Sequence, residues 1–355
     1  MTKTGSTDLE ALGLNLVAGL STCIGGLIVL HRRLVHLANP SSLGLALGVS
    51  AGVMIFISLV EIFTESVDNF KKVLGCDDEK IFKAEFCKNN FTSLVELSNV
   101  HVETIRDTLG CEKGNINKTI CDGNSWSLAT VFFIIGCGII FLMDLIVHKI
   151  SPEAGLPLDV DELDALRHSA THLDSTHRSD SPEILRSRPM KKSFDDTVTK
   201  QALNRTGILT ALAIAIHNLP EGIAIYMGAR NEKKLGIELA ISIALHNIPE
   251  GIAVATPVYF ATGSRLKAFL WTFLSALAEP LGGVLCWLII GGNLNPMVNG
   301  IMFGLVVGMM MTISVKELLP TAHRFCQSKD KLATSIIVGM CVMALSLIVF
   351  AYVGL

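Results

Sequence analysis

The sequence predicts an all-α polytopic membrane protein whose chain crosses the bilayer eight times. Half of the 355 residues are hydrophobic and only 17% are charged, and the mean hydropathy is +0.51. The apolar residues gather in runs of about 20, the length that an α-helix needs to cross a hydrocarbon core of about 30 Å. These runs are continuous and do not alternate as in barrel strands. Because a backbone in lipid must satisfy its own hydrogen bonds, each run is predicted to be a helix.

The eight predicted spans are bounded by polar residues, glycine or proline. They cover residues 11–30, 43–64, 126–147, 206–228, 235–260, 267–290, 298–319 and 332–354. The first run is longer than the apolar part of a signal peptide and lacks a clear cleavage site, so we expect it to be retained. This pattern divides the chain into three helices in 1–147, a flexible cytosolic loop in 148–205 and five helices in 206–355. A net charge of −3 gives no indication of nucleic-acid binding.

Two signals predict that both termini face the outside or an organelle lumen. Lysine and arginine are more frequent in the connections after the first, fifth and seventh spans, which the positive-inside rule places in the cytosol. The insert at about 68–125 holds four cysteines and two Asn-x-Thr sequons, as an oxidising compartment permits. The plasma membrane is therefore the first expectation, although a secretory-pathway membrane fits equally. The candidate disulfide cysteines, with their pairing open, are Cys76, Cys87, Cys111 and Cys121, and the candidate glycosylation sites are Asn90 and Asn117.

A twelve-residue sequence occurs twice, once in the fourth span and once in the fifth. Ile214–Ile225 and Ile243–Val254 lie 29 residues apart and match at nine of twelve positions. In each copy His and Glu are four residues apart and Asn and Glu are three apart, so the three side chains share one helical face. An ionised side chain at the bilayer centre costs about 2.5–3.5 kcal/mol, so such residues normally face a protein interior or a polar pathway. The proline in each copy predicts that the helix kinks or unwinds.

Two such helices facing each other offer imidazole, amide and carboxylate groups to a metal. This mixed set of nitrogen and oxygen ligands suits borderline divalent cations such as Zn²⁺, Fe²⁺ and Mn²⁺. Each Glu can serve both neighbours, so it can bridge two cations or pass one along the helix. Glu279, beside Pro280 in the sixth span, is predicted as a further ligand. The candidate metal ligands are His217, Asn218, Glu221, His246, Asn247, Glu250 and Glu279. A structural cluster of interhelical hydrogen bonds is the alternative, and the second copy disfavours it.

Other polar residues are weaker candidates. Glu61 and Glu317 lie near the ends of the second and seventh spans, where each either lines an entrance or exit or pairs with a lysine. Asp144 is explained by its place at the membrane interface. The loop 148–205 carries His168, His172 and His177, which either bind or sense a metal or belong to an ordinary solvated loop.

With these motifs the chain resembles the ZIP family of zinc and iron permeases, and within it the ZupT- and GufA-like members. The resemblance is carried by His-Asn-Leu-Pro-Glu-Gly at 217–222, His-Asn-Ile-Pro-Glu-Gly at 246–251 and Ala-Glu-Pro at 278–280. It implies a transporter that moves Zn²⁺, or Fe²⁺, Mn²⁺, Co²⁺ or Cd²⁺, into the cytosol without an organic cofactor. It also implies a homodimer in the lipid bilayer and alternating access by movement of two helix bundles.

The resemblance further implies a binuclear site at mid-membrane. One metal would be held by His217, Glu221, His246 and Glu250, and the other by Asn218, Glu221, Asn247, Glu250 and Glu279. Many family members have an additional histidine in the second motif, and this chain lacks it. That difference disfavours exclusive selectivity for zinc.

The sequence disfavours two alternatives to transport and leaves a third open. An intramembrane zinc hydrolase needs a string such as His-Glu-x-x-His, and none occurs. An ATP-driven pump needs a phosphate-binding loop, which is also missing from the sequence. A metal-gated channel or a metal-sensing receptor would share the site, and the sequence does not distinguish either from a carrier. A divalent-cation transporter that is not an enzyme is the best prediction.

Overall fold

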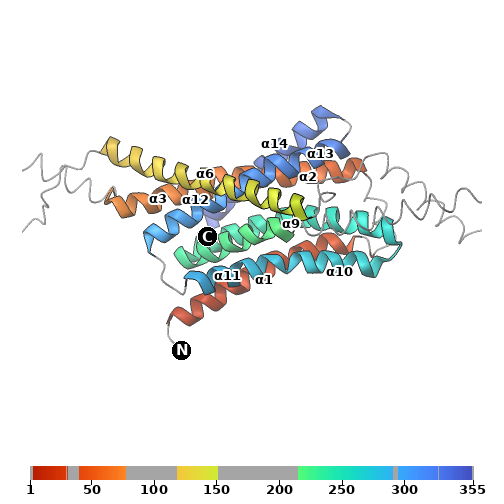
Figure 1. Cartoon of the computed structure of the whole chain (residues 1–355), viewed down its shortest axis with the longest axis horizontal. Coiled ribbons are helices and arrows are strands. Elements are labelled where there is room, and N and C mark those ends of the chain that lie inside the picture. The colour runs from red at the N-terminus through yellow and green to blue at the C-terminus, as the bar shows by residue number, and fades with distance from the viewer. Residues whose placement is uncertain are drawn as a thin grey trace, which may run out of the picture.

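The computed structural model describes residues 3–28, 30, 40–76, 118–150, 215–290, 295–326 and 328–353. Within these ranges every regular element is helical (Figure 1). Seven helical segments of the described part are long and apolar enough to cross a membrane. The remaining predicted span, 206–228, begins outside the described residues and is helical from 215 to 231. The predicted all-α membrane fold is confirmed.

The helices follow one another in the order of the predicted spans. They are α1 (Lys3–Leu27), α2 (Pro40–Phe56), α3 (Phe63–Leu74), α6 (Lys118–Ile150), the helix at 215–231, α9 (Lys233–Thr262), α10 (Arg265–Ala276), α11 (Ala278–Ile290), α12 (Pro296–Ile313), α13 (Leu319–Phe325) and α14 (Lys329–Val353). Two short π-helical segments, η2 (Ile57–Ile62) and η3 (Ser314–Leu318), join α2 to α3 and α12 to α13.

The second span is longer than the sequence predicted, because its helical segment runs over Ser41–Leu74. The charged residues of α3 suggested the start of a loop, but the helix continues with an apolar face. Val67 and Phe70 on that face are buried, and the ring of Phe70 stacks on that of Phe132 in α6. The helix ends at Gly75, whose φ of 72° is the left-handed conformation that favours glycine at a helix C-cap.

The helices form two groups that lie side by side (Figure 1). The motif bundle consists of α1, the helix at 215–231, α9, α10 and α11. The supporting bundle consists of α2, η2, α3, α6, α12, η3, α13 and α14. Among the labelled helices, α9 packs against α2 across the boundary between the bundles. The metal-ligand candidates of the repeated motif therefore lie in one of two separately packed bodies.

Glycine allows backbone contact between helices inside each bundle. A Cβ atom on Gly251 would lie 1.9 Å from the carbonyl oxygen of Thr22 in α1, and one on Gly222 would lie 1.9 Å from that of Glu279. In the supporting bundle, a Cβ atom on Gly339 would lie 2.1 Å from the carbonyl oxygen of Val49. For every described helical glycine with close neighbours, the nearest atoms belong to its own bundle. The interface between the bundles has no such glycine contact within the described residues.

The sixth predicted span is interrupted beside Pro280, whereas the two helices that hold the repeated motif are continuous. α10 ends at Ala276 and α11 begins at Ala278, because Pro280 lacks the amide hydrogen that would continue the ladder. By contrast, the helix at 215–231 and α9 continue through Pro220 and Pro249, so of the two predicted alternatives, a kink or unwinding, unwinding does not occur there. A single lost hydrogen bond is tolerated where neighbouring helices pack closely on the backbone.

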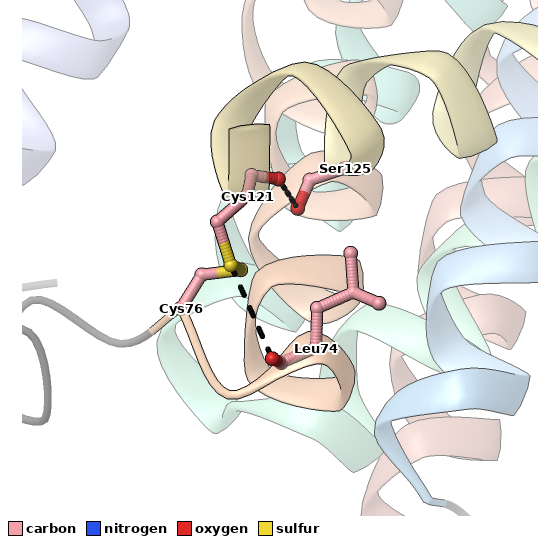
Figure 2. Close-up of a disulfide and its surroundings, with 4 residues drawn as sticks. All are labelled: Leu74, Cys76, Cys121 and Ser125. Atoms are coloured by element: carbon pink, nitrogen blue, oxygen red, sulfur yellow. Dashed lines mark hydrogen bonds between the residues drawn. A yellow bond between two sulfur atoms is a disulfide. The ribbon is translucent and has the colours of Figure 1, made fainter. Parts of the chain in front are cut away.

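A disulfide between Cys76 and Cys121 joins the end of α3 to the first turn of α6, as Figure 2 shows. Ser125 donates a hydrogen bond of 3.0 Å to the carbonyl oxygen of Cys121. We call this end of the molecule the disulfide end, and the end that holds Gly263 and the α13–α14 connection the opposite end. The predicted Cys87, Cys111, Asn90, Asn117, His168, His172 and His177 lie outside the described residues.

Candidate metal centre

The seven ligand candidates lie inside the motif bundle and are almost completely buried. None of them is more than 3% exposed. The helix at 215–231 provides three of these residues, α9 provides three, and Glu279 lies in the first turn of α11. Buried carboxylates are costly unless a positive charge or hydrogen-bond donors compensate them. A site with three such carboxylates is therefore suited to a cation.

Glu221, His246 and Glu250 form the tightest group. Each offers one ligand atom, and these atoms all lie within 4.8 Å of one another. The Nε2 atom of His246 is 3.0 Å from Oε1 of Glu221, and its Nδ1 atom is 3.2 Å from the carbonyl oxygen of Ser242. A proton on Nδ1 would be donated to that carbonyl, which leaves the lone pair of Nε2 directed at the group. This arrangement is suited to metal ligation by Nε2.

The two asparagines use their amide hydrogens on the protein. Asn247 donates to Oε2 of Glu279 at 2.6 Å and to the carbonyl oxygen of Ala18 at 3.2 Å. Asn218 donates to the carbonyl oxygen of Ser275 at 3.4 Å. Because the amide NH₂ groups are engaged, the amide oxygens remain available as acceptors or metal ligands.

Six buried oxygen atoms of the site have no hydrogen-bond partner among the described residues. They are Oδ1 of Asn218, Oε2 of Glu221, Oδ1 of Asn247, both carboxylate oxygens of Glu250, and Oε1 of Glu279. Folded proteins pair most of their buried polar atoms, so six unpaired acceptors in one place need an explanation. Divalent cations would satisfy them and would neutralise the three carboxylates. The residues present therefore fit a metal.

His217 has a different environment from its counterpart in the second copy. Its Nε2 atom lies 3.2 Å from Oε2 of Glu317, which belongs to η3 of the supporting bundle. Lys316 beside Glu317 pairs with Asp144 of α6 and lies 4.8 Å from the centre of the Phe141 ring. The His217–Glu317 contact thus joins the two bundles, whereas the Lys316–Asp144 pair holds the supporting bundle together.

Both carboxylates that the sequence suggested for an entrance or exit lie in π-helical segments. Glu61 is in η2 and Glu317 is in η3. Short π-helical turns inside α-helices are frequent at functional sites. The sequence alone gave no signal for these turns.

Some supporting residues were not predicted from the sequence. Ser50 of α2 donates a hydrogen bond of 3.3 Å to the carbonyl oxygen of His246, and the bond crosses the interface between the bundles. Ser242 could have been found, because it lies four residues before His246 on the same helical face. Ser50 could not, because its role depends on how α2 packs against α9.

The chain is similar to known zinc transporters over nearly its whole length. Residues 111–347 match the family described as ZIP zinc transporter. The zinc transporter ZupT of Lysinibacillus sphaericus is 36% identical over 340 residues, which cover 96% of this chain and 97% of that protein. The protein of the same name from Clostridium perfringens is 34% identical over 96% of this chain and 96% of its own length. That from Chlorobium phaeovibrioides is 37% identical over 96% of this chain and 98% of its own length. The chain therefore belongs to the ZIP zinc transporter family.

Proposed function

We propose that this protein carries zinc and related divalent cations across a membrane through a binuclear site in the motif bundle. The observation that carries the proposal is the group of six unpaired buried oxygens around the imidazole of His246. These groups lie in the middle of membrane-spanning helices, where unpaired polar atoms are costly. Zinc is the first choice because relatives at 34–37% identity are named zinc transporters.

The two metal positions share their bridging carboxylates. The first position uses His246, Glu221 and Glu250, whose ligand atoms are within 4.8 Å of one another, and it is completed by His217. The second position uses the amide oxygens of Asn218 and Asn247, the same two glutamates, and Glu279. Unpaired buried oxygens support the second position. Each of its five residues has a side-chain oxygen without a hydrogen-bond partner among the described residues, and that oxygen is free to bind a metal.

The ligand set favours a broad range of divalent cations. It combines imidazole nitrogen with amide and carboxylate oxygens and has no thiolate, which is the ligand that selects strongly for soft metals. We therefore expect Mn²⁺, Fe²⁺, Co²⁺ and Cd²⁺ to compete with Zn²⁺. No organic cofactor is needed for such transport.

Transport proceeds by movement of the two bundles relative to each other. Tight glycine contacts hold each bundle together. The described polar contacts that join the bundles are few: examples are His217–Glu317 toward the opposite end and Asn231–Glu65 toward the disulfide end. A structure with two tightly packed bodies and a polar interface is suited to alternating access. A channel would behave differently in kinetic measurements. The metal flux through a carrier saturates at low metal concentration and its turnover is slow, whereas a channel would give single-channel currents.

The disulfide end faces the outside or an organelle lumen in this proposal. Disulfides such as Cys76–Cys121 form and persist in oxidising compartments. The sequons at Asn90 and Asn117 agree with glycosylation on that side, and the plasma membrane is the proposed location.

An inside-negative potential contributes about 2.3 kcal/mol per charge per 100 mV, so it drives a divalent cation inward. A homodimer in the lipid bilayer completes the proposal.

The test is uptake of radioactive zinc into proteoliposomes by the parent protein and by the Glu221→Gln and Glu250→Gln variants. Both variants keep the side-chain shape but remove a bridging charge, so saturable uptake should be lost in each. Glu232→Gln is the matched control, because Glu232 is an exposed residue at the start of α9 and should leave uptake unchanged. Uptake that persists in both bridging variants would overturn the mechanism. Thermal stability of the variants equal to that of the parent would show that lost uptake does not come from unfolding.

A further inference from the structure

Asn231 lies at the tip of the hairpin that the two motif helices form, toward the disulfide end of the molecule. The helix at 215–231 ends at this residue, and α9 begins two residues later at Lys233. The two helices touch at the tip, since a Cβ atom on Gly236 would lie 2.3 Å from the Cα atom of Ala229. The tip therefore joins the two helices that hold six of the seven central ligand candidates.

The residue before Asn231 fixes this tip to α1. The Nε atom of Arg230 lies 2.9 Å from Oδ1 of Asp8, and the hydroxyl of Tyr226 donates to the same oxygen at 2.9 Å. Asp8 belongs to α1, so these contacts stay within the motif bundle. Asn231 is therefore carried by the motif bundle as a whole.

The carboxamide of Asn231, in contrast, is bonded to the supporting bundle through both of its polar groups. Its Nδ2 atom donates to Oε1 of Glu65 in α3 at 2.6 Å, and its Oδ1 atom accepts from Nδ2 of Asn299 in α12 at 2.8 Å. Glu65 is also held by Asn69 of α3, which donates to the same Oε1 atom at 2.9 Å. Reversing the amide of Asn231 would turn its oxygen toward the carboxylate, so its orientation is fixed.

The two partners of Asn231 are held together inside the supporting bundle. Ser66 of α3 donates a hydrogen bond of 2.7 Å to the carbonyl oxygen of Gly300 in α12. Ser66 follows Glu65 in the sequence, and Gly300 follows Asn299. Helices α3 and α12 thus keep the two bonding partners at a fixed spacing, independently of the motif bundle.

Movement of the bundles must therefore break these bonds if the disulfide end is to open. Asn231 belongs to one body, and both of its partners belong to the other. Glu221 and Asn231 are ten residues apart on one helix, which corresponds to a rise of about 15 Å. A displacement of the central ligands and a displacement of Asn231 are thus one movement.

We propose that Asn231 is a gating residue whose bonds to Glu65 and Asn299 hold the disulfide end closed and break when that end opens to admit metal. The proposal rests on the proposed function, in which the two bundles move relative to each other. The bond to Glu65 has a carboxylate acceptor, and a bond of this kind shifts an equilibrium between two states by about ten- to hundredfold.

The test exchanges the donor and acceptor roles of the pair. Asn231→Asp places a carboxylate against that of Glu65, so the end should open about tenfold more often. Glu65→Gln alone keeps an acceptor for Asn231 and should have a smaller effect. In the double variant, the new amide at 65 can donate to the new carboxylate at 231, so the closed end should be restored. This rescue separates a specific bond from a general loss of packing.

Hydrogen–deuterium exchange of the full-length protein in detergent measures the opening. Peptides around 228–236 and 296–301 should exchange about tenfold faster in Asn231→Asp and at the parental rate in the double variant, with no change around 314–318. Glu232→Gln is the matched control, because Glu232 is exposed and lies next to Asn231. Fast exchange in the double variant, parental exchange in Asn231→Asp, or acceleration in all three peptides would overturn the gate.

Zinc uptake tests whether the gate belongs to the transport cycle. When more molecules are open at the disulfide end, the apparent affinity for metal added on that side rises. Asn231→Asp should therefore lower the KM by about three- to tenfold, and it should lower the maximal rate because the loaded protein closes less readily. The double variant should restore both values.

Any other kinetic pattern would overturn the role in transport, including a raised KM with an unchanged maximal rate. If the parent transports no zinc, the proposed function fails. The exchange measurement still decides in that case whether Asn231 holds the disulfide end closed.

Discussion

Asn247 donates a hydrogen bond of 2.6 Å to Glu279, and this bond connects the repeated motif to the interrupted helix of α10 and α11. Asn218 reaches the same interrupted helix through the carbonyl oxygen of Ser275. The asparagines of both copies therefore bond to the same interrupted helix, whereas the histidines of the two copies contact carboxylates in different bundles. His246 lies against Glu221 inside the motif bundle, and His217 lies against Glu317 of the other bundle. Two copies with the same His, Asn and Glu thus form an asymmetric site.

The first prediction concerns the second metal position. Asn247→Ala removes both an amide oxygen and the hydrogen bond that orients Glu279, so we expect one of two bound Cd²⁺ ions to bind about 10–100-fold more weakly. The other ion should change little, because His246 and Glu250 are intact. Calorimetric titration of the purified protein measures both affinities.

Asn295→Ser is the control for this measurement, because Asn295 is an exposed N-cap of α12 and serine caps equally well. Equal weakening of both ions, or of neither, would show that the two positions are not divided as proposed.

The second prediction concerns glycine packing in the motif bundle. Gly222→Ala and Gly251→Ala would each place a methyl carbon 1.9 Å from a backbone carbonyl oxygen, so helices must move apart. We expect each to lower stability by about 1–3 kcal/mol. Gly138→Ala in α6 meets nothing within 4 Å and should be neutral or stabilising, since alanine is the better helix former. Thermal unfolding in detergent compares the three, and equal stability of all would contradict the close backbone packing.

The helices and the central ligands could be predicted because both leave local signals. An apolar run of sufficient length predicts a span, and the His-x-x-x-Glu spacing places His217 and Glu221, or His246 and Glu250, on one face. The extension of the second span into α3 was missed because the charged residues Glu65 and Asp68 indicated a solvent-exposed loop. Its apolar partners, such as Phe132, are supplied by a distant helix.

The contacts between the bundles could not be predicted. Ser50 and Asn231 have ordinary sequence surroundings, and Glu317 was a candidate only as a carboxylate near the end of a span. The partner of each is defined only when two helices far apart in the chain meet. The π-helical turns that contain Glu61 and Glu317 likewise depend on tertiary packing. Sequence patterns show which face of a helix is polar, but they do not show which residue lies opposite.

The third prediction concerns the disulfide. It joins residues 45 apart in the sequence, and a native disulfide that closes a loop of this size contributes about 2–4 kcal/mol. Cys76→Ser and Cys121→Ser should each lower the thermal stability, and a reducing agent should lower that of the parent but not of the variants. Cys341→Ser, at an exposed free cysteine, is the control. Labelling of both Cys76 and Cys121 by a thiol reagent without prior reduction would contradict the bond.

The last prediction concerns the contact between the bundles at His217 and Glu317. Glu317→Gln removes the negative charge but keeps a polar group of the same shape. A charged hydrogen bond at a partly exposed position contributes about 1–2 kcal/mol, so its loss should shift the balance between bundle arrangements by about five- to thirtyfold. Hydrogen–deuterium exchange should become faster in the peptides around 215–220 and 314–318, with no acceleration in α3 at the disulfide end.

Asp330→Asn is the matched control for this experiment, because Asp330 lies in the exposed first turn of α14 in the same bundle. If Glu317→Gln and Asp330→Asn give the same exchange, the His217–Glu317 contact does not hold the bundles together. If exchange accelerates at both ends, the substitution has loosened the whole fold. Only acceleration confined to the opposite end agrees with a contact that closes that end while the motif bundle keeps its own packing.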